Sequence, residues 1–114
     1  MNLTAESVAE ALVVNVDEER IDAAVAIQFK DRMRDLTAGA GGRIILDLGR
    51  VIFVDSSGLG AIVSVMKFLA PAHRLELAGL TPNVGRVFHL TRMDSVFPIH
   101  ADVAAALHGA GHDL

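Results

Sequence analysis

The chain has no cysteine, no tryptophan and no tyrosine, and five phenylalanines are its only aromatic residues apart from histidine. The absence of cysteine excludes disulfides, thiolate chemistry and cysteine-ligated zinc, and it fits a cytoplasmic location. Because aromatic residues are scarce, we expect a core of aliphatic side chains. The net charge is −4, from ten basic and fourteen acidic residues. Since no basic stripe interleaved with aromatics occurs, we expect no nucleic-acid partner.

Long apolar runs are also missing, because charges interrupt them at Asp47, Asp55 and Lys67. No run reaches the length of a membrane span, and the first residues lack the basic and apolar segments of a secretory signal. We therefore expect no membrane insertion. A hydrophobic content of 52% predicts a folded chain. The length of 114 residues predicts one domain over residues 1–114, with a core at about 11–107 and a loose tail at 108–114.

Strand-like and helix-like apolar patterns alternate along the chain. The strand patterns cover residues 11–16, 43–48 with an apolar continuation at 51–54, 75–78 and 96–100, and the helix patterns cover residues 23–36, 57–70, 82–91 and 102–107. Helices between strands imply crossover connections. The patterns predict an α/β fold with a mixed, partly parallel sheet of four to five strands and about four helices. Pro98 indicates that the last strand lies at an edge.

Residues 55–60, with the sequence DSSGLG, join an apolar strand to an apolar helix. Two hydroxyls, a carboxylate and two glycines therefore meet at a helix N-terminus, where unpaired N–H groups and the helix dipole favour a phosphate. A serine here is a candidate for reversible phosphorylation. The alternative is that Ser56 or Ser57 only caps the helix. Asp55 either polarises the turn or positions the Ser56 hydroxyl.

Catalytic and cofactor motifs are weak in this chain. Gly58 and Gly60 lack the lysine of a phosphate-binding loop and the third glycine of a dinucleotide fingerprint. No Gly-x-Ser-x-Gly elbow occurs. The five histidines are scattered, and glycines between His108 and His112 argue against a helical metal pair. We therefore expect no enzyme activity, no cofactor and no metal site.

Taken in order, these residues resemble the STAS domain family, and within it the small stand-alone bacterial anti-sigma factor antagonists. The most specific match is residues 44–48 (IILDL) followed by residues 51–60 (VIFVDSSGLG). A secondary match covers residues 75–82 (LELAGLTP) and continues to Thr91. The resemblance extends over about residues 11–107. It implies the STAS-type sheet and a signalling role that regulates transcription indirectly.

In the antagonists that this chain resembles, the hydroxyl residue directly after the aspartate is phosphorylated, and here that residue is Ser56. The resemblance implies that the kinase is an anti-sigma factor with a histidine-kinase-like ATPase fold. The unmodified antagonist binds it, phosphorylation breaks the contact, and a separate serine phosphatase restores it. For Ser57 we keep capping as the expected role. The residues expected to bind the partner are Ile21, Asp22, Asp55, Ser56, Ser57, Gly58, Leu59, Gly60, Ser64 and Lys67.

The chain departs from the family pattern at two places. Family members usually carry a glycine just before the Leu/Ile-Asp that leads into the first helix, whereas Glu19 and Arg20 precede Ile21 here. Many members have a glycine after the threonine near the end, where this chain has Arg92. The first departure concerns the identity of the partner more than the fold. An alternative reading is a STAS subunit without a switch, in a lipid-transport ABC complex or a stress-sensing scaffold.

Overall fold

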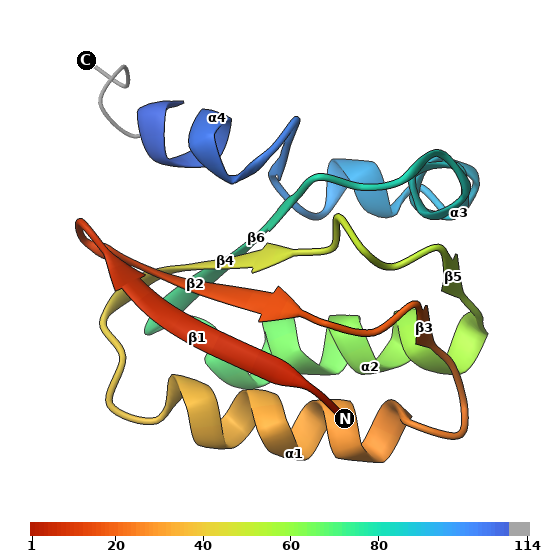
Figure 1. The fold of residues 1–114 in the computed structure, drawn as a ribbon, viewed down its shortest axis with the longest axis horizontal. Coiled ribbons are helices and arrows are strands. Elements are labelled where there is room, and N and C mark those ends of the chain that lie inside the picture. The colour runs from red at the N-terminus through yellow and green to blue at the C-terminus, as the bar shows by residue number, and fades with distance from the viewer. Residues whose placement is uncertain (110–114) are drawn as a thin grey trace.

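A computed structural model describes residues 1–109 and contains one mixed five-stranded sheet in the order β1-β2-β4-β6-β7 (Figure 1). The strands are β1 (Leu3–Val8), β2 (Ala11–Val16), β4 (Gly42–Asp47), β6 (His73–Ala78) and β7 (Ile99–His100). The first two form an antiparallel hairpin, and the remaining pairs are parallel. A separate two-stranded parallel ladder joins β3 (Arg20–Ile21) to β5 (Phe53–Val54).

Helices cover both faces of the sheet (Figure 1). One face carries α1 (Ala26–Thr37) and α2 (Ser56–Leu69), which pack side by side. The other side carries α3 (Pro82–Leu90), a short 3₁₀ turn η1 (Met93–Ser95) and α4 (Val103–Gly109). These elements confirm the expected α/β fold with four helices. No helix in residues 1–109 is long and apolar enough to cross a membrane.

The main core lies between the sheet and the α1–α2 layer, and it is largely aliphatic. Fully buried members include Phe29, Met33, Ile44, Leu46 and Ile62. Ile44 and Leu46 face this layer because side chains alternate along β4, and Ile45 faces a smaller cluster on the side of α4. The continuous burial of these three residues is what a central parallel strand requires.

A buried ionic network joins α4 to strands β4, β6 and β7 of the sheet. The side chain of Glu76 is 3% exposed and accepts hydrogen bonds from Arg43 Nε at 2.6 Å and Nη2 at 2.7 Å. His100 Nε2 lies 2.7 Å from the same carboxylate, and Arg43 also donates to the Ala106 carbonyl of α4. Burial raises the pKa of Glu76, but the Arg43 and His100 hydrogen bonds outweigh it and hold that pKa below its usual 4.5.

The N-terminal strand β1 was not expected from the sequence. Only Leu3 of its six residues is buried, so the strand has no alternating apolar pattern to reveal it. Its pairing with β2 makes it an edge strand. The expected continuation at residues 51–54 is also different, because only Phe53–Val54 is a strand and it pairs with β3.

Several predicted boundaries were wrong by a few residues. Helix α1 begins at Ala26 instead of residue 23, because the side chain and carbonyl of Asp22 accept the N–H groups of Ala24 and Val25 and hold a turn there. The strand expected at 96–100 is limited to Ile99–His100, because the N–H groups of Val96 and Phe97 donate back to the Met93 carbonyl of the 3₁₀ turn. Helix α4 runs to Gly109, so the first two residues of the expected tail are helical. The remaining tail, residues 110–114, lies outside the described residues.

Candidate functional site

Asp55 caps the N-terminus of α2, which begins at Ser56. Its backbone is extended, and its Oδ1 accepts the Gly58 N–H at 2.8 Å. The expectation that Ser57 caps this helix was therefore wrong. The physical reason is the position of the helix start: Ser56 and Ser57 already lie inside the first turn, and the cap is the residue before it.

The second oxygen of Asp55 joins the helix to a distant loop. Oδ2 accepts the Ala23 N–H at 3.1 Å, across 32 positions of sequence. The Gly58 N–H has the largest effect on the Asp55 pKa and lowers it. Desolvation opposes this effect, and the N–H groups of Ala23 and Ser57 and the Arg20 charge lower the pKa further. The pKa of Asp55 therefore lies below its usual 3.8, and the carboxylate is held ionised as a clamp between the β3–α1 loop and α2.

Gly58 is required by the close approach of two backbones. A Cβ at this position would lie 1.9 Å from the Ile21 carbonyl oxygen and 2.7 Å from its carbonyl carbon. Gly60, two residues further along α2, has no atom within 4 Å of the corresponding point. The first turn of α2 therefore packs directly on β3, and only glycine fits at the contact.

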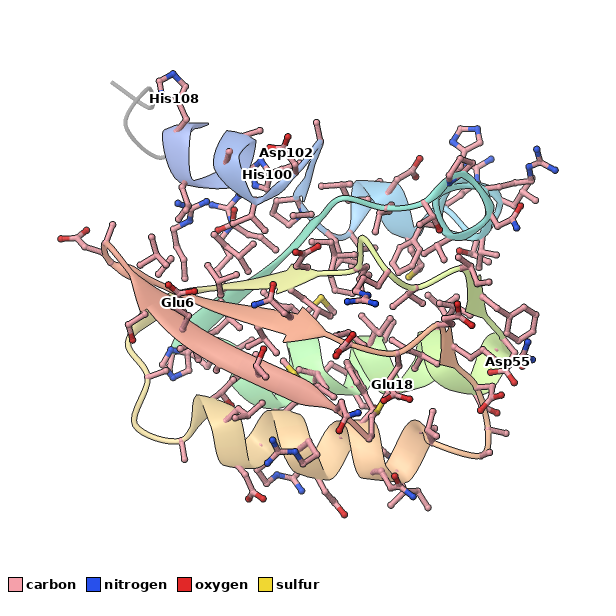
Figure 2. All side chains as sticks on the ribbon, in the orientation of Figure 1. Glu6, Glu18, Asp55, His100, Asp102 and His108 are labelled. Carbon is pink, nitrogen blue, oxygen red and sulfur yellow. The ribbon has the colours of Figure 1, made fainter. Side chains whose placement is uncertain are left out.

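The two serines of the first turn are both exposed, whereas Ile21 and Gly58 are buried. Figure 2 shows Asp55 at the edge of the molecule where β3, β5 and the start of α2 meet. The Ile21 side chain is fully buried, and Gly58 has no side chain, so neither residue can contact a partner through a side chain. If these two residues contribute to binding, they do so by positioning the exposed residues around them.

The remaining predicted binding residues follow the helix. Ser56, Gly60, Ser64 and Lys67 recur at spacings of four, four and three, which places them on one side of α2. Ser64 is half-buried, and Lys67 and Gly60 are exposed. Leu59 is half-buried and packs against the main core. We call the exposed residues of the β3–α1 loop (22–25) and of the first turn of α2 (56–60) the Ser56 surface.

Sequence reasoning missed two residues beside this surface, Ile52 and Phe53, and noted Arg20 only as part of a departure from the family pattern. Ile52 and Phe53 are 50% and 39% exposed, although both belong to an apolar run that predicts a buried strand. Arg20 lies over the Phe53 ring, with its guanidinium carbon 4.2 Å from the ring centroid. One signal could have indicated their exposure. The run between Gly49 and Asp55 is short, and it leaves room for only one turn and a two-residue strand.

The histidines form no metal site in the described part of the chain. Within residues 1–109 there is no group of three or more His, Asp or Glu side chains that could hold an ion. His89 pairs with Asp94 at 2.8 Å, and His100 belongs to the Glu76 network (Figure 2). The expectation that His108 and His112 form no helical metal pair stays untested, because His112 lies outside the described residues.

The model of the STAS domain family matches residues 2–106. The chain belongs to the STAS domain family. BtrV of Bordetella bronchiseptica, whose name assigns it to the anti-sigma factor antagonists, is 31% identical to this STAS chain over 91 residues, covering 79% of this chain and 72% of BtrV. The match to BtrV therefore extends over most of the chain.

Two solved structures have the same fold over nearly the whole chain. An anti-sigma factor antagonist from Mycobacterium paratuberculosis has a TM-score of 0.84 at 24% identity, covering 95% of this chain and 92% of that one. The Bacillus cell-fate determinant SpoIIAA in its phosphorylated form has a TM-score of 0.69 at 25% identity, covering 96% of this chain and 99% of that one. The sheet and the helices of the STAS domain are thus shared with proteins of this regulatory class.

Proposed function

We propose that this STAS protein is a phosphorylation-switched anti-sigma factor antagonist, a regulatory binding protein and not an enzyme. The observation that carries the proposal is the exposed Ser56 hydroxyl at the first position of α2, on a surface already held in place by Asp55 and Gly58. The class of its relative BtrV and the existence of a phosphorylated SpoIIAA support it.

The partner of the unmodified protein is a kinase-type anti-sigma factor with a histidine-kinase-like ATPase fold. It docks on the Ser56 surface and along the stripe that ends at Lys67. Both oxygens of Asp55 accept backbone N–H groups, so its role in this proposal is to hold the surface in place. The group that removes the Ser56 hydroxyl proton is expected to come from the kinase. A separate serine phosphatase reverses the modification.

Phosphorylation would add nearly two negative charges beside Asp55. The N-terminus of α2 attracts such a group by about 1 kcal/mol at an exposed site, so the free protein stays folded. In a closed interface, an unmatched charge costs several kcal/mol. The interface cost exceeds the helix gain, so the modified protein releases its partner. The clamp of Asp55 keeps the surface in one shape, and the switch therefore works through charge without rearranging the fold.

The test combines a modification assay with a binding assay. The purified protein is incubated with ATP and the anti-sigma factor kinases encoded by the same genome, and a gain of about 80 Da on the peptide containing Ser56 is expected. Ser56→Ala must abolish this gain, and Ser57→Ala is the matched control that must retain it. Ser56→Asp must lose binding. Unmodified protein that co-purifies stably with an ABC-type ATPase, with no mass gain, would instead favour the STAS subunit reading.

A further inference from the structure

The Ser56 surface continues into an exposed apolar pair. Ile52 and Phe53 are 50% and 39% exposed, while their neighbour Val54 is buried in the main core. Large apolar side chains that lie together on a surface are typical of a binding site for another protein. Because Phe53 and Ile52 lie two and three residues before the Asp55 cap, a protein that covers Ser56 would also reach them.

Arg20 fixes the orientation of the Phe53 ring. The two residues are directly opposite each other in the β3–β5 ladder, and the guanidinium carbon of Arg20 lies 4.2 Å from the ring centroid. Its Nε donates to Asp22 Oδ2 at 3.3 Å. The two terminal nitrogens of Arg20 make no hydrogen bond within residues 1–109. A stacked cation holds one face of the ring, so the ring loses little freedom when a partner covers its other side.

Carboxylates border this pair on the side of the β2–β3 loop. A hollow of about 550 Å³ lies there, and its charged lining residues are Asp17, Glu18, Glu19, Arg20, Asp22 and Arg50. Ion pairs join Asp17 to Arg50 at 3.1 Å and Asp22 to Arg20. Glu18 and Glu19 have no cationic partner among residues 1–109. The border therefore carries uncompensated negative charge.

We propose that Phe53, oriented by Arg20, is the apolar anchor through which this chain recognises its anti-sigma factor. The complementary face of that partner has an apolar pocket for Phe53 and Ile52, with lysine or arginine side chains placed opposite Glu18 and Glu19. An apolar centre with a charged border is the usual anatomy of a protein interface, and buried aromatic residues often dominate its energy. This inference rests on the proposed function, because it names the recognition element of the same complex.

The two parts of the surface act on different rates. Opposite charges at the border speed the encounter, so Glu18 and Glu19 raise the association rate at low salt. A basic partner would attract a phosphorylated protein as well, so phosphorylation of Ser56 cannot act by long-range repulsion. It must act in the closed complex and increase the dissociation rate. Truncation of Phe53 must also increase the dissociation rate.

The experiment measures binding kinetics of the full chain to each purified anti-sigma factor kinase of the same genome. Phe53→Ala is expected to weaken binding at least about 10-fold through faster dissociation. Leu90→Ala is the matched control, because Leu90 at the end of α3 is 73% exposed and belongs neither to the β3–β5 ladder nor to the Ser56 surface, and its binding must stay within about two-fold of wild type. Arg20→Lys keeps the charge but loses the planar stack, so it should reproduce part of the Phe53→Ala loss. Each variant is first checked for unchanged urea unfolding.

A Glu18→Gln/Glu19→Gln variant tests the border. Slower association and a weaker dependence on salt are expected, with dissociation unchanged. An unaltered association rate would refute the claim that the partner places basic side chains opposite Glu18 and Glu19. If wild type binds and Ser56→Asp does not, but Phe53→Ala binds like Leu90→Ala, the anchor is wrong and the switch stands. If the unmodified wild type binds none of the kinases, the anchor and the proposed function fail together.

Discussion

Replacing Gly58 by alanine tests the contact that builds the Ser56 surface. The new Cβ would lie 1.9 Å from the Ile21 carbonyl oxygen, and real Cβ atoms essentially never approach closer than 3.0 Å. The two backbones must therefore separate by about 1 Å, which is the difference between these distances. Because β3 has only two residues, a shift of Ile21 also disturbs its pairing with β5.

The magnitude follows from two opposing effects. Overpacking costs about 1–3 kcal/mol, and the upper end applies because the obstacle is backbone and cannot rotate away. Alanine gains about 1 kcal/mol over glycine in a helix. The free energy of unfolding should fall by about 2 kcal/mol, which lowers the melting temperature by about 10 °C in a domain of this size.

Gly60→Ala is the matched control, because it makes the same chemical change in the same helix where nothing lies within 4 Å. It should raise the free energy of unfolding by up to about 1 kcal/mol. Urea unfolding followed by circular dichroism gives both values. A Gly58→Ala protein as stable as wild type, or a Gly60→Ala protein that loses as much stability, would refute the steric argument. Gly58→Ala should also weaken partner binding, since the loop of residues 22–25 moves with Ile21.

Two further predictions concern carboxylates with lowered pKa values. Asp55→Ala should destabilise the protein more than Asp55→Asn, because asparagine can still cap α2 but its amide nitrogen cannot accept the Ala23 N–H; thermal unfolding measures both. Since the folded-state pKa of Asp55 lies below 3.8, its contribution is present above that pH and is lost as the pH falls through the folded value, so wild type and Asp55→Ala should converge in strong acid. Glu76→Ala leaves Arg43 and His100 without their carboxylate and should cost about 3 kcal/mol in urea unfolding. The pKa of Glu76 is also lowered, so this difference should persist at pH 5 and shrink only below 4.5, and a constant difference down to pH 2 would contradict the ionic role.

The apolar patterns predict most of the fold. The apolar strand pattern at residues 43–48 and the helix pattern at residues 23–36 are strong signals, and the structure has β4 and α1 there. The edge strand β1 gives no such signal, because five of its six residues are exposed or half-buried. Edge strands are set by pairing with a neighbour, which a local pattern does not record.

The candidate site was predicted only in part. The position of Ser56 follows from the strand-to-helix transition, and Ser56 is exposed in the structure. The capping role of Asp55 depends on whether α2 begins at residue 56 or at residue 57, and apolar patterns do not locate a helix end to one residue. The contact between Gly58 and Ile21 joins residues 37 positions apart, so no local signal contains it. Arg92, at the position where many family members carry glycine, adopts φ 61°, which is the left-handed backbone that glycine favours.

The placement of α4 has a practical consequence. Helix α4 and the β3–β5 ladder lie at opposite ends of the molecule (Figure 1). A tether attached beyond α4 would orient an immobilised copy with Ser56 and Phe53 directed away from the support. Coupling through Lys67 would instead attach the support to the side of α2 that is proposed to meet the partner.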